Sequence, residues 1–180
     1  MDLDNEVVLV NGPSSSGKSL WAERLIESCN QVAYIATSFN DPNDSTFQER
    51  INKHRERRPV NWKLIEASSD LPNDIRKIDN SYVLIIESLG GFVAQTLHLS
   101  SKEWSDLQQD LINTITNHKN KVIIVIEEAS WGVVPTTSSG LMFRDRLGLT
   151  SQELEPISKQ FWLVISGRAI DMKTYGVAVK

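Results

Sequence analysis

The residues of this chain that could do chemistry begin in a loop near the N-terminus that is rich in glycine and serine. Gly12, four intervening residues, and then Gly17, Lys18 and Ser19 fit the pattern G-x-x-x-x-G-K-[ST]. Glycine lets the backbone turn tightly, so several N–H groups can converge on a phosphate, and a helix that begins near Lys18 adds the positive end of its dipole. In this pattern Lys18 reaches the β- and γ-phosphates and the Ser19 hydroxyl ligates Mg²⁺. The loop therefore predicts a protein that takes a nucleoside triphosphate together with Mg²⁺.

A nucleotide-bound Mg²⁺ usually also needs a carboxylate at the end of a neighbouring apolar strand. Two apolar runs end in such residues: Glu87 follows YVLII, and Glu127 and Glu128 follow VIIVI. The alternative for each of them is an acidic residue that only faces water. The sequence favours a metal-associated role for one of the two strands and does not distinguish between them.

The second stretch with chemical potential is ERINKHRERRPVNW, residues 49–62. Arg50, His54 and Arg58 recur at every fourth position, so a helix would place them on one face, and Pro59 would end that helix. Repulsion from the surrounding arginines would lower the pKa of His54 and keep its imidazole neutral and nucleophilic. The same arginines could bind a triphosphate. The alternative interpretation is a solvated basic helix.

A scaffold must position these residues, and short, β-branched, almost continuously apolar runs predict one. Strands of this composition are buried on both faces, as in a parallel sheet covered by helices. Strand alternating with helix predicts an α/β fold of three layers with a mostly parallel central sheet, in one domain over residues 1–180. Gly148 would end the last helix, and the tail from 168 to 180 is expected to be an edge strand or a partly free end. We expect strands at 6–11, 31–37, 82–88, 121–128 and 160–167, a further candidate at 61–67, and helices at 18–28, 44–57, 101–118 and 139–147.

Composition excludes several classes of partner. The chain has 180 residues, of which 40% are hydrophobic and 23% charged, and its net charge is −4, so no global basic field would recruit nucleic acid. The longest apolar runs are too short to span a bilayer, and the acidic MDLDNE at the N-terminus does not read as a secretory signal. Cys29 is the single cysteine, which excludes an internal disulfide. We expect a cytoplasmic enzyme with a small-molecule substrate, without a nucleic-acid partner or a membrane span.

Further blocks follow in a fixed order: GPSSSGKS with AERLI, VAYIATS, RINKHRERRPVNW, the strand that ends in Glu87, WGVVP, FRDRLG, and LVISG followed by MK. Together they resemble the bifunctional adenosylcobinamide kinase/adenosylcobinamide-phosphate guanylyltransferases of cobalamin biosynthesis, nearly end to end. The resemblance implies a P-loop NTPase-like α/β fold, often in a homotrimer, and a corrinoid substrate. It also implies two reactions at one site. The first phosphorylates the aminopropanol hydroxyl of adenosylcobinamide, and the second transfers GMP from GTP, through a histidine, to the cobinamide phosphate.

The resemblance also implies roles for individual residues. His54 falls where the family has its guanylylated histidine, and Lys18 would act with it as the second catalytic residue. Ser19 and Glu87 would hold Mg²⁺. The residues expected to bind the nucleotide, GTP or ATP, are Gly12, Pro13, Ser14, Ser15, Ser16, Gly17, Lys18, Ser19, Ala36, Thr37, Ser38, Arg55, Glu56, Arg57, Arg58, Glu66 and Glu87.

Several positions depart from the pattern of the family. Pro13 stands where the family usually has glycine, and the other departures fall at 88–90, 127–130, 151–152 and 168–169, where this chain reads SLG, EEAS, SQ and RA. These later departures cluster in loops after strand C-termini, where ligands bind in open α/β sheets. We therefore expect the acceptor half of the site to differ from that of a typical family member, and the nucleotide half to be retained.

Two other interpretations fit the same motifs. One is a P-loop kinase of another small alcohol, in which His54 only orients phosphate, and the other is a nucleotide-binding regulatory relative without turnover. GTP turnover by the purified protein separates the enzymes from the regulator, and phosphorylation of adenosylcobinamide separates the two enzymes. The other histidines lack an arginine cluster: His98 is expected in a loop and His118 at a helix end, facing solvent.

Overall fold

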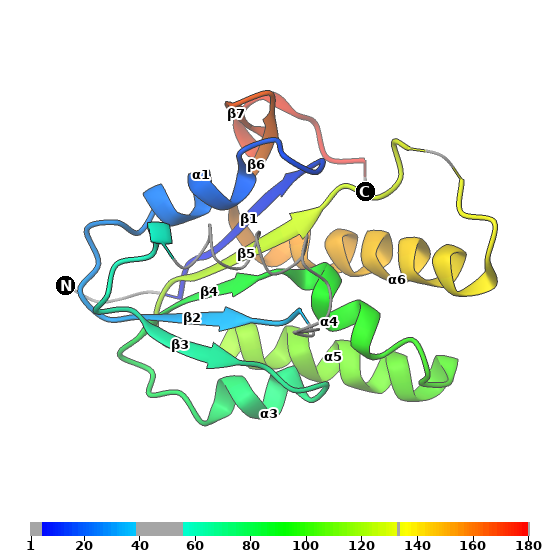
Figure 1. Ribbon diagram of the computed structural model, residues 1–180, viewed down its shortest axis with the longest axis horizontal. Coiled ribbons are helices and arrows are strands. Elements are labelled where there is room, and N and C mark those ends of the chain that lie inside the picture. The colour runs from blue at the N-terminus through cyan, green and yellow to red at the C-terminus, as the bar shows by residue number, and fades with distance from the viewer. Residues whose placement is uncertain (1–4, 39–55, 133, 180) are drawn as a thin grey trace.

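The centre of the protein is one seven-stranded sheet in the order β3-β2-β4-β5-β1-β6-β7, as Figure 1 shows. It is seen in a computed structural model, which describes residues 5–38, 56–132 and 134–179. Neighbouring strands run parallel, except that β7 is antiparallel to β6. All the expected strands are confirmed, the candidate at 61–67 included. The strands are β1 (Val7–Gly12), β2 (Val32–Ala36), β3 (Lys63–Glu66), β4 (Val83–Glu87), β5 (Val122–Glu127), β6 (Ser158–Ile165) and β7 (Arg168–Asp171).

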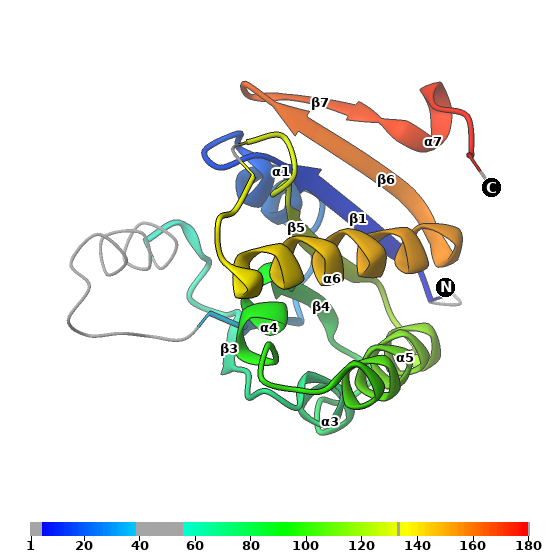
Figure 2. The same cartoon turned by 90° about the vertical axis from the view of Figure 1, so that its right-hand side faces the viewer.

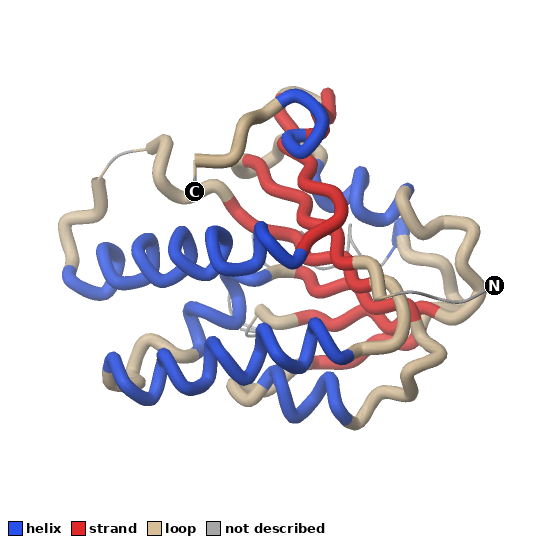
Figure 3. The backbone as a smooth tube through the Cα atoms, turned by 180° about the vertical axis from the view of Figure 1, so that it is seen from behind, coloured by secondary structure: helices blue, strands red, loops and turns tan. Residues whose placement is uncertain are grey.

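Helices flank this sheet on both faces and make three layers (Figure 2). On one face α1 packs on β1, β4, β5 and β6, and on the other α3 packs against α5 and α4 against α6. Figure 3 shows the strands as one continuous twisted layer beside these helices. The predicted three-layer α/β fold with a mostly parallel central sheet is confirmed. The helices are α1 (Lys18–Arg24), α3 (Leu71–Arg76), α4 (Leu89–Gln95), α5 (Ser101–Asn117), α6 (Ser138–Leu154), the 3-10 helix η1 (Glu155–Ile157) and α7 (Met172–Tyr175).

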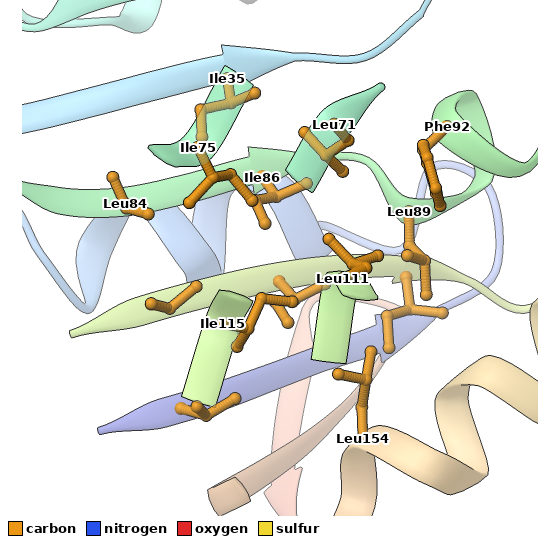
Figure 4. Packing of buried hydrophobic residues seen from close by; sticks show 14 of the residues in the cluster. Ile35, Leu71, Ile75, Leu84, Ile86, Leu89, Phe92, Leu111, Ile115 and Leu154 are labelled. Carbon is orange, nitrogen blue, oxygen red and sulfur yellow. The ribbon is translucent and has the colours of Figure 1, made fainter. Parts of the chain in front are cut away.

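Two buried apolar clusters hold the layers together. The larger one lies between the sheet and the helices α3 to α6, and in Figure 4 Leu111 and Ile115 of α5 point toward the strands within it. The smaller one lies under α1. Val8 belongs to the smaller cluster and Leu9 to the larger, since successive strand residues point to opposite faces. Burial on both faces explains why the central strands are almost continuously apolar.

The last long helix continues past Gly148, so the predicted end of that helix was wrong. Helix α6 runs to Leu154, and its second half carries Leu147, Thr150 and Leu154, which are 2%, 0% and 0% exposed. A glycine inside a helix lowers its stability by about 1 kcal/mol relative to alanine. Burying one leucine side chain stabilises the fold by about 1.5–3 kcal/mol. Packing against the core therefore overrides the local signal.

Two short helices, α3 and α4, were not predicted. The first begins at LPN, where Asp70 caps the helix by accepting a hydrogen bond from the Asn73 N–H at 3.3 Å. The second contains Gly90 and Gly91 in its first turn. Proline and paired glycines usually indicate loops, so both segments looked irregular in the sequence.

The basic segment, the first helix and the tail agree with the sequence predictions only in part. The expected helix 44–57 lies mostly outside the described residues, and within its described part Glu56 and Arg57 are helical and Pro59 follows the helix. The expected helix at 18–28 is shorter than predicted, since α1 ends at Arg24. The tail forms β7, an antiparallel edge strand, and then α7. Within the described ranges, none of the helices has the length and apolar character needed to cross a membrane.

Candidate active site

The residues expected to bind nucleotide gather at one edge of the sheet, where the parallel strands end. Strand pairing places Gly12 opposite Glu127, and it places Ala36 between Glu66 and Glu87. Helix α1 begins a few residues after β1, so its N-terminus lies at this same edge. Open α/β sheets bind ligands at this edge.

The phosphate loop, residues 12–19, has the backbone that its glycines predicted. Gly17 has a φ of +97°, which side chains rarely tolerate. A Cβ on Gly12 would lie 2.3 Å from the Val164 carbonyl oxygen, so only glycine fits against β6 at this point. The Ser16 carbonyl accepts a hydrogen bond of 2.9 Å from the turn between β6 and β7. Strand β6 and the turn that follows it therefore hold the backbone of the loop in place.

The two side chains of the loop that carry the predicted chemistry both make hydrogen bonds at this edge. Lys18 is 9% exposed, and its Nζ donates a hydrogen bond of 3.4 Å to the Pro13 carbonyl, so the ammonium folds back over the loop. Ser19 Oγ donates a hydrogen bond of 2.8 Å to Glu87 Oε1. This bond joins the start of α1 to the end of β4.

The pair of Ser19 and Glu87 fits the chemistry of a Mg²⁺ site. Glu87 Oε2 is buried and has no hydrogen-bond partner, and Mg²⁺ prefers oxygen ligands such as carboxylates, hydroxyls, phosphates and water. Within the part of the chain that the structure describes, no group of three or more His, Cys, Asp or Glu side chains could hold a metal. The Ser19–Glu87 pair suits Mg²⁺, because that ion usually takes one or two protein ligands and completes its shell with phosphate and water.

Burial raises the pKa of the Glu87 carboxyl to about 7. The hydrogen bond from Ser19 opposes this shift, the negative charge of Glu127 adds to it, and the positive charge of Lys18 opposes it again. Desolvation dominates because the ionised carboxylate loses its water in this position. A bound dication would reverse the preference, since it stabilises the ionised form.

We expect the metal-free protein to lose stability as the pH rises through this range. A carboxyl whose pKa is raised by folding from 4.5 to about 7 stabilises the fold below pH 4.5, and this contribution is lost between pH 4.5 and 7. Glu87→Gln removes this titration. The unfolding free energy of the variant minus that of the wild type should therefore be about 2–3 kcal/mol larger at pH 8 than at pH 5. Urea unfolding with a chelator present at both pH values measures this difference, and a constant difference would contradict the prediction.

The side chain of Glu128 is bonded to Ser130, although its backbone N–H donates a hydrogen bond of 2.9 Å to the Gly12 carbonyl of the phosphate loop. Its carboxylate accepts hydrogen bonds from the Ser130 N–H, at 2.7 Å, and from the Ser130 hydroxyl. Glu87 therefore differs from Glu128 in facing Ser19, which supports the expected choice of Glu87 as the metal-associated acid.

Glu127 joins two strand ends. Its carboxylate accepts hydrogen bonds from the Ser88 hydroxyl and from the Gly90 N–H, the latter at 3.0 Å. The departures at 88–90 and at 127, which are far apart in the sequence, are thus in direct contact.

The basic segment reaches the site through two arginines. Arg57 Nη2 pairs with Glu23 Oε1 of α1 at 3.1 Å, and the Arg58 guanidinium lies 4.4 Å from the centre of the Tyr34 ring of β2. Burial raises the pKa of Glu23, and the charge of Arg57 opposes that shift. These contacts fasten the end of the segment to α1, which follows the phosphate loop, and to β2.

The other predicted site residues are placed as follows. Thr37 is buried, and its hydroxyl donates to the Ser88 carbonyl and accepts from the Ser88 N–H at 2.8 Å. Ser38 is exposed directly after it, and Glu66 is exposed at the end of β3. Ser14, Ser15 and Glu56 are exposed, Ser16 is buried, and His54 and Arg55 lie outside the described residues.

Sequence reasoning missed Glu23 and Tyr34. Glu23 lies four residues after Ser19 on α1, and this spacing puts both on one helix face, so a usable signal was present. Tyr34 sits inside an apolar strand, and the sequence had no feature that marked it as the partner of an arginine.

Comparisons with known proteins show the family of the chain. The sequence model described as cobinamide kinase / cobinamide phosphate guanyltransferase matches residues 8–172. The bifunctional adenosylcobalamin biosynthesis protein CobU of Escherichia coli (strain K12) is 33% identical over 183 residues, which cover 93% of this chain and 99% of the relative. The protein of the same name from Salmonella typhimurium (strain LT2) is 30% identical over 182 residues, which cover 93% and 99%.

A solved structure supports the fold alone. The structure titled "Structural study of Project ID PH0250 from Pyrococcus horikoshii OT3" superposes with a TM-score of 0.55 at 9% identity, and covers 98% of this chain and 88% of that chain. The sequence matches carry the assignment further, because they span nearly the whole chain and include the phosphate loop. The chain belongs to the cobinamide kinase / cobinamide phosphate guanyltransferase family.

Proposed function

We propose that this protein phosphorylates adenosylcobinamide and then transfers GMP from GTP to adenosylcobinamide phosphate through a His54–GMP intermediate. The observation that supports this most is the contact of 2.8 Å between Ser19 of the phosphate loop and the buried Glu87, in a chain of this family. It joins a phosphate-binding backbone to a carboxylate suited to Mg²⁺.

In the kinase step, the substrate hydroxyl oxygen attacks the γ-phosphorus of ATP or GTP, and the nucleoside diphosphate leaves. Lys18 would neutralise the charge that develops on the phosphate oxygens, and Ser19 and Glu87 would hold a Mg²⁺ that offsets the same charge. The hydroxyl proton would pass to solvent water as the new P–O bond forms.

In the transfer step, an imidazole nitrogen of His54 attacks the α-phosphorus of GTP, and pyrophosphate leaves. The phosphate of the cobinamide product then attacks the same phosphorus and releases His54. Two in-line displacements replace one difficult transfer. The arginines beside His54 would stabilise the charge on the reacting phosphates.

The remaining expected nucleotide contacts belong to this proposal as well. Ala36, Thr37 and Ser38 lie at the end of β2, next to β4, and Glu66 ends β3 on the far side of β2, where the nucleoside would extend from the loop. Glu56 and Arg55 to Arg58 would line its other side. We place the reaction in the cytoplasm, because it consumes nucleoside triphosphates.

A homotrimer is part of the same proposal. Leu141, Met142 and Leu149 of α6 are 36%, 40% and 57% exposed, and a further subunit would cover such apolar side chains. Sedimentation equilibrium of the purified protein tests the oligomeric state independently of activity.

The direct test of the proposed function uses GTP labelled at the α-phosphate. The protein is incubated with it in the presence and absence of adenosylcobinamide phosphate. We expect label on the protein without the acceptor and on the corrinoid product with it. Label on neither would favour a kinase of another alcohol, and absence of any GTP turnover would favour a regulatory relative.

Glu87 and Glu128 make a matched pair for testing the metal assignment. Glu87→Gln should raise the Mg²⁺ concentration needed for half-maximal turnover by about tenfold or more, because it removes a negative charge next to the dication. Glu128→Gln removes the same charge from a side chain bonded to Ser130 and should leave that concentration nearly unchanged. The reverse ranking in a Mg²⁺ titration of initial rates would refute the assignment.

A further inference from the structure

The first turn of α4 is held from two sides immediately after Glu87. On one side, Glu127 accepts from both the Ser88 hydroxyl and the Gly90 N–H, so its two carboxylate oxygens serve two donors in one turn. On the other side, the Thr37 hydroxyl bonds with both the N–H and the carbonyl of Ser88. The residue that follows Glu87 is therefore fixed by the ends of β5 and β2 together.

Gly90 shows how tightly Glu127 fits this turn. A Cβ on Gly90 would lie 2.4 Å from Glu127 Oε2 and 2.9 Å from its Cδ. Real Cβ atoms do not approach so closely, so a side chain at 90 and this placement of the Glu127 carboxylate exclude one another. The two residues form one structural unit, although 37 positions separate them.

We propose that Glu127 is a positioning residue for the metal pair: by binding Ser88 and Gly90 it fixes the end of β4, and so keeps the Glu87 carboxylate opposite Ser19. Within the described part of the chain, Glu127 contacts neither Ser19 nor Glu87 through a hydrogen bond, so its positioning effect would pass through the backbone. The inference rests on the proposed role of Glu87 at Mg²⁺.

The charge of Glu127 could act on the metal without any positioning, and two substitutions separate these effects. In Glu127→Gln the amide oxygen can accept from Gly90, and the amide NH₂ can donate to the Ser88 oxygen, so both contacts survive without the charge. Glu127→Ala removes the contacts and the charge together. If positioning matters, alanine disturbs the metal pair and glutamine preserves it.

The measurement is Mn²⁺ binding, followed by electron paramagnetic resonance in the presence of a non-hydrolysable GTP analogue. Glu127→Ala should weaken Mn²⁺ affinity by about tenfold, as is usual for loss of a group that orients a metal ligand, while Glu127→Gln should stay within about threefold of the wild type. Ser88→Ala removes one of the two donors, and its Mn²⁺ affinity should lie between those of Glu127→Gln and Glu127→Ala. This variant tests the proposal even if Glu127→Ala does not fold. Equal weakening in the glutamine and alanine variants would overturn the proposal in favour of a charge effect.

A double-mutant cycle tests the coupling to Gly90. Gly90→Ala should weaken Mn²⁺ affinity in the wild type, because the new methyl displaces the carboxylate, and should add little in the Glu127→Ala background, where the clash is absent. Additive effects would overturn the coupling. Glu128→Ala, which removes the neighbouring carboxylate from its bonds to Ser130, is the matched control and should bind Mn²⁺ as the wild type does.

The Mn²⁺ affinities of two variants, Glu87→Gln and Glu127→Ala, distinguish an error in this inference from an error in the proposed metal site. If Glu87→Gln leaves Mn²⁺ affinity unchanged, the assignment of Glu87 itself is wrong. If Glu87→Gln weakens binding and Glu127→Ala does not, Glu87 keeps its role and Glu127 loses its own.

Discussion

Replacing His54 with alanine should abolish guanylyl transfer while the kinase reaction continues. The two steps attack different phosphorus atoms, and only the α-phosphorus step needs a nucleophile from the protein. The Ser19–Glu87 pair, which the kinase step would use, is complete within the described residues without His54. The variant should therefore convert adenosylcobinamide to its phosphate and stop there. Product analysis of one reaction mixture, containing adenosylcobinamide and GTP, reads both steps at once.

The same substitution should remove the covalent intermediate. A bond from an imidazole nitrogen to GMP is a phosphoramidate, which is labile in acid and stable in base, because protonated nitrogen is a good leaving group. The wild type should take up label from the α-phosphate of GTP and lose it in acid. Uptake by His54→Ala, or retention of the label in acid, would contradict the proposed carrier.

His98 and His118 are the controls for this experiment. His98 is exposed between α4 and α5. His118 was expected to face solvent, and this was wrong: it is 4% exposed, and its Nε2 lies 2.9 Å from the Tyr82 carbonyl. Tyr82 precedes β4, so His118 sits at the edge of the sheet opposite the phosphate loop. Alanine at either position should leave the amount of label per molecule of folded protein unchanged.

The fold was predictable because its strongest signals are buried strands. A strand covered on both faces needs an unbroken apolar run, and four of the five predicted runs form β1, β2, β4 and β5, which are buried along most of their length. The fifth run forms β6, which is mostly half-buried or exposed. The errors fall where tertiary contacts outweigh local preference. Gly148 lies inside α6 because buried residues beyond it extend the helix. Gly90 and Gly91 allow α4 to approach Glu127 and Thr37, and a sequence does not show that approach.

The candidate site was predictable in its phosphate half for a similar reason. The residues at 12–19 are adjacent in sequence, so their spacing carries the geometry. From the residues alone the choice among Glu87, Glu127 and Glu128 stayed open, and the family resemblance implied Glu87. The structure adds that Glu87 is the carboxylate bonded to Ser19. Glu127 shows the limit most clearly: its partners lie more than 35 positions away, and only the pairing of β4 and β5 brings them near.

Replacing Lys18 with alanine should stop both reactions, in contrast to His54→Ala. Lys18 is the one fully charged cation in the phosphate loop, and its Nζ folds over the loop to within 3.4 Å of the Pro13 carbonyl. A triphosphate bound there would meet a buried ammonium, and both displacements increase the charge on oxygens that it can contact. Loss of one such electrostatic contact lowers rates by about 100-fold or more.

The control for Lys18→Ala is Arg24→Ala. Arg24 is an exposed cation in the last turn of the same helix, so it changes the net charge equally at a distance from the phosphates. We expect Arg24→Ala to keep wild-type rates and Lys18→Ala to lose both phosphorylation of adenosylcobinamide and labelling by GTP, with thermal unfolding showing that each variant is folded. Wild-type turnover in a folded Lys18→Ala protein would remove the phosphate loop from the mechanism. Loss of labelling alone would place Lys18 with His54 at the α-phosphate, because the kinase step would then proceed without it.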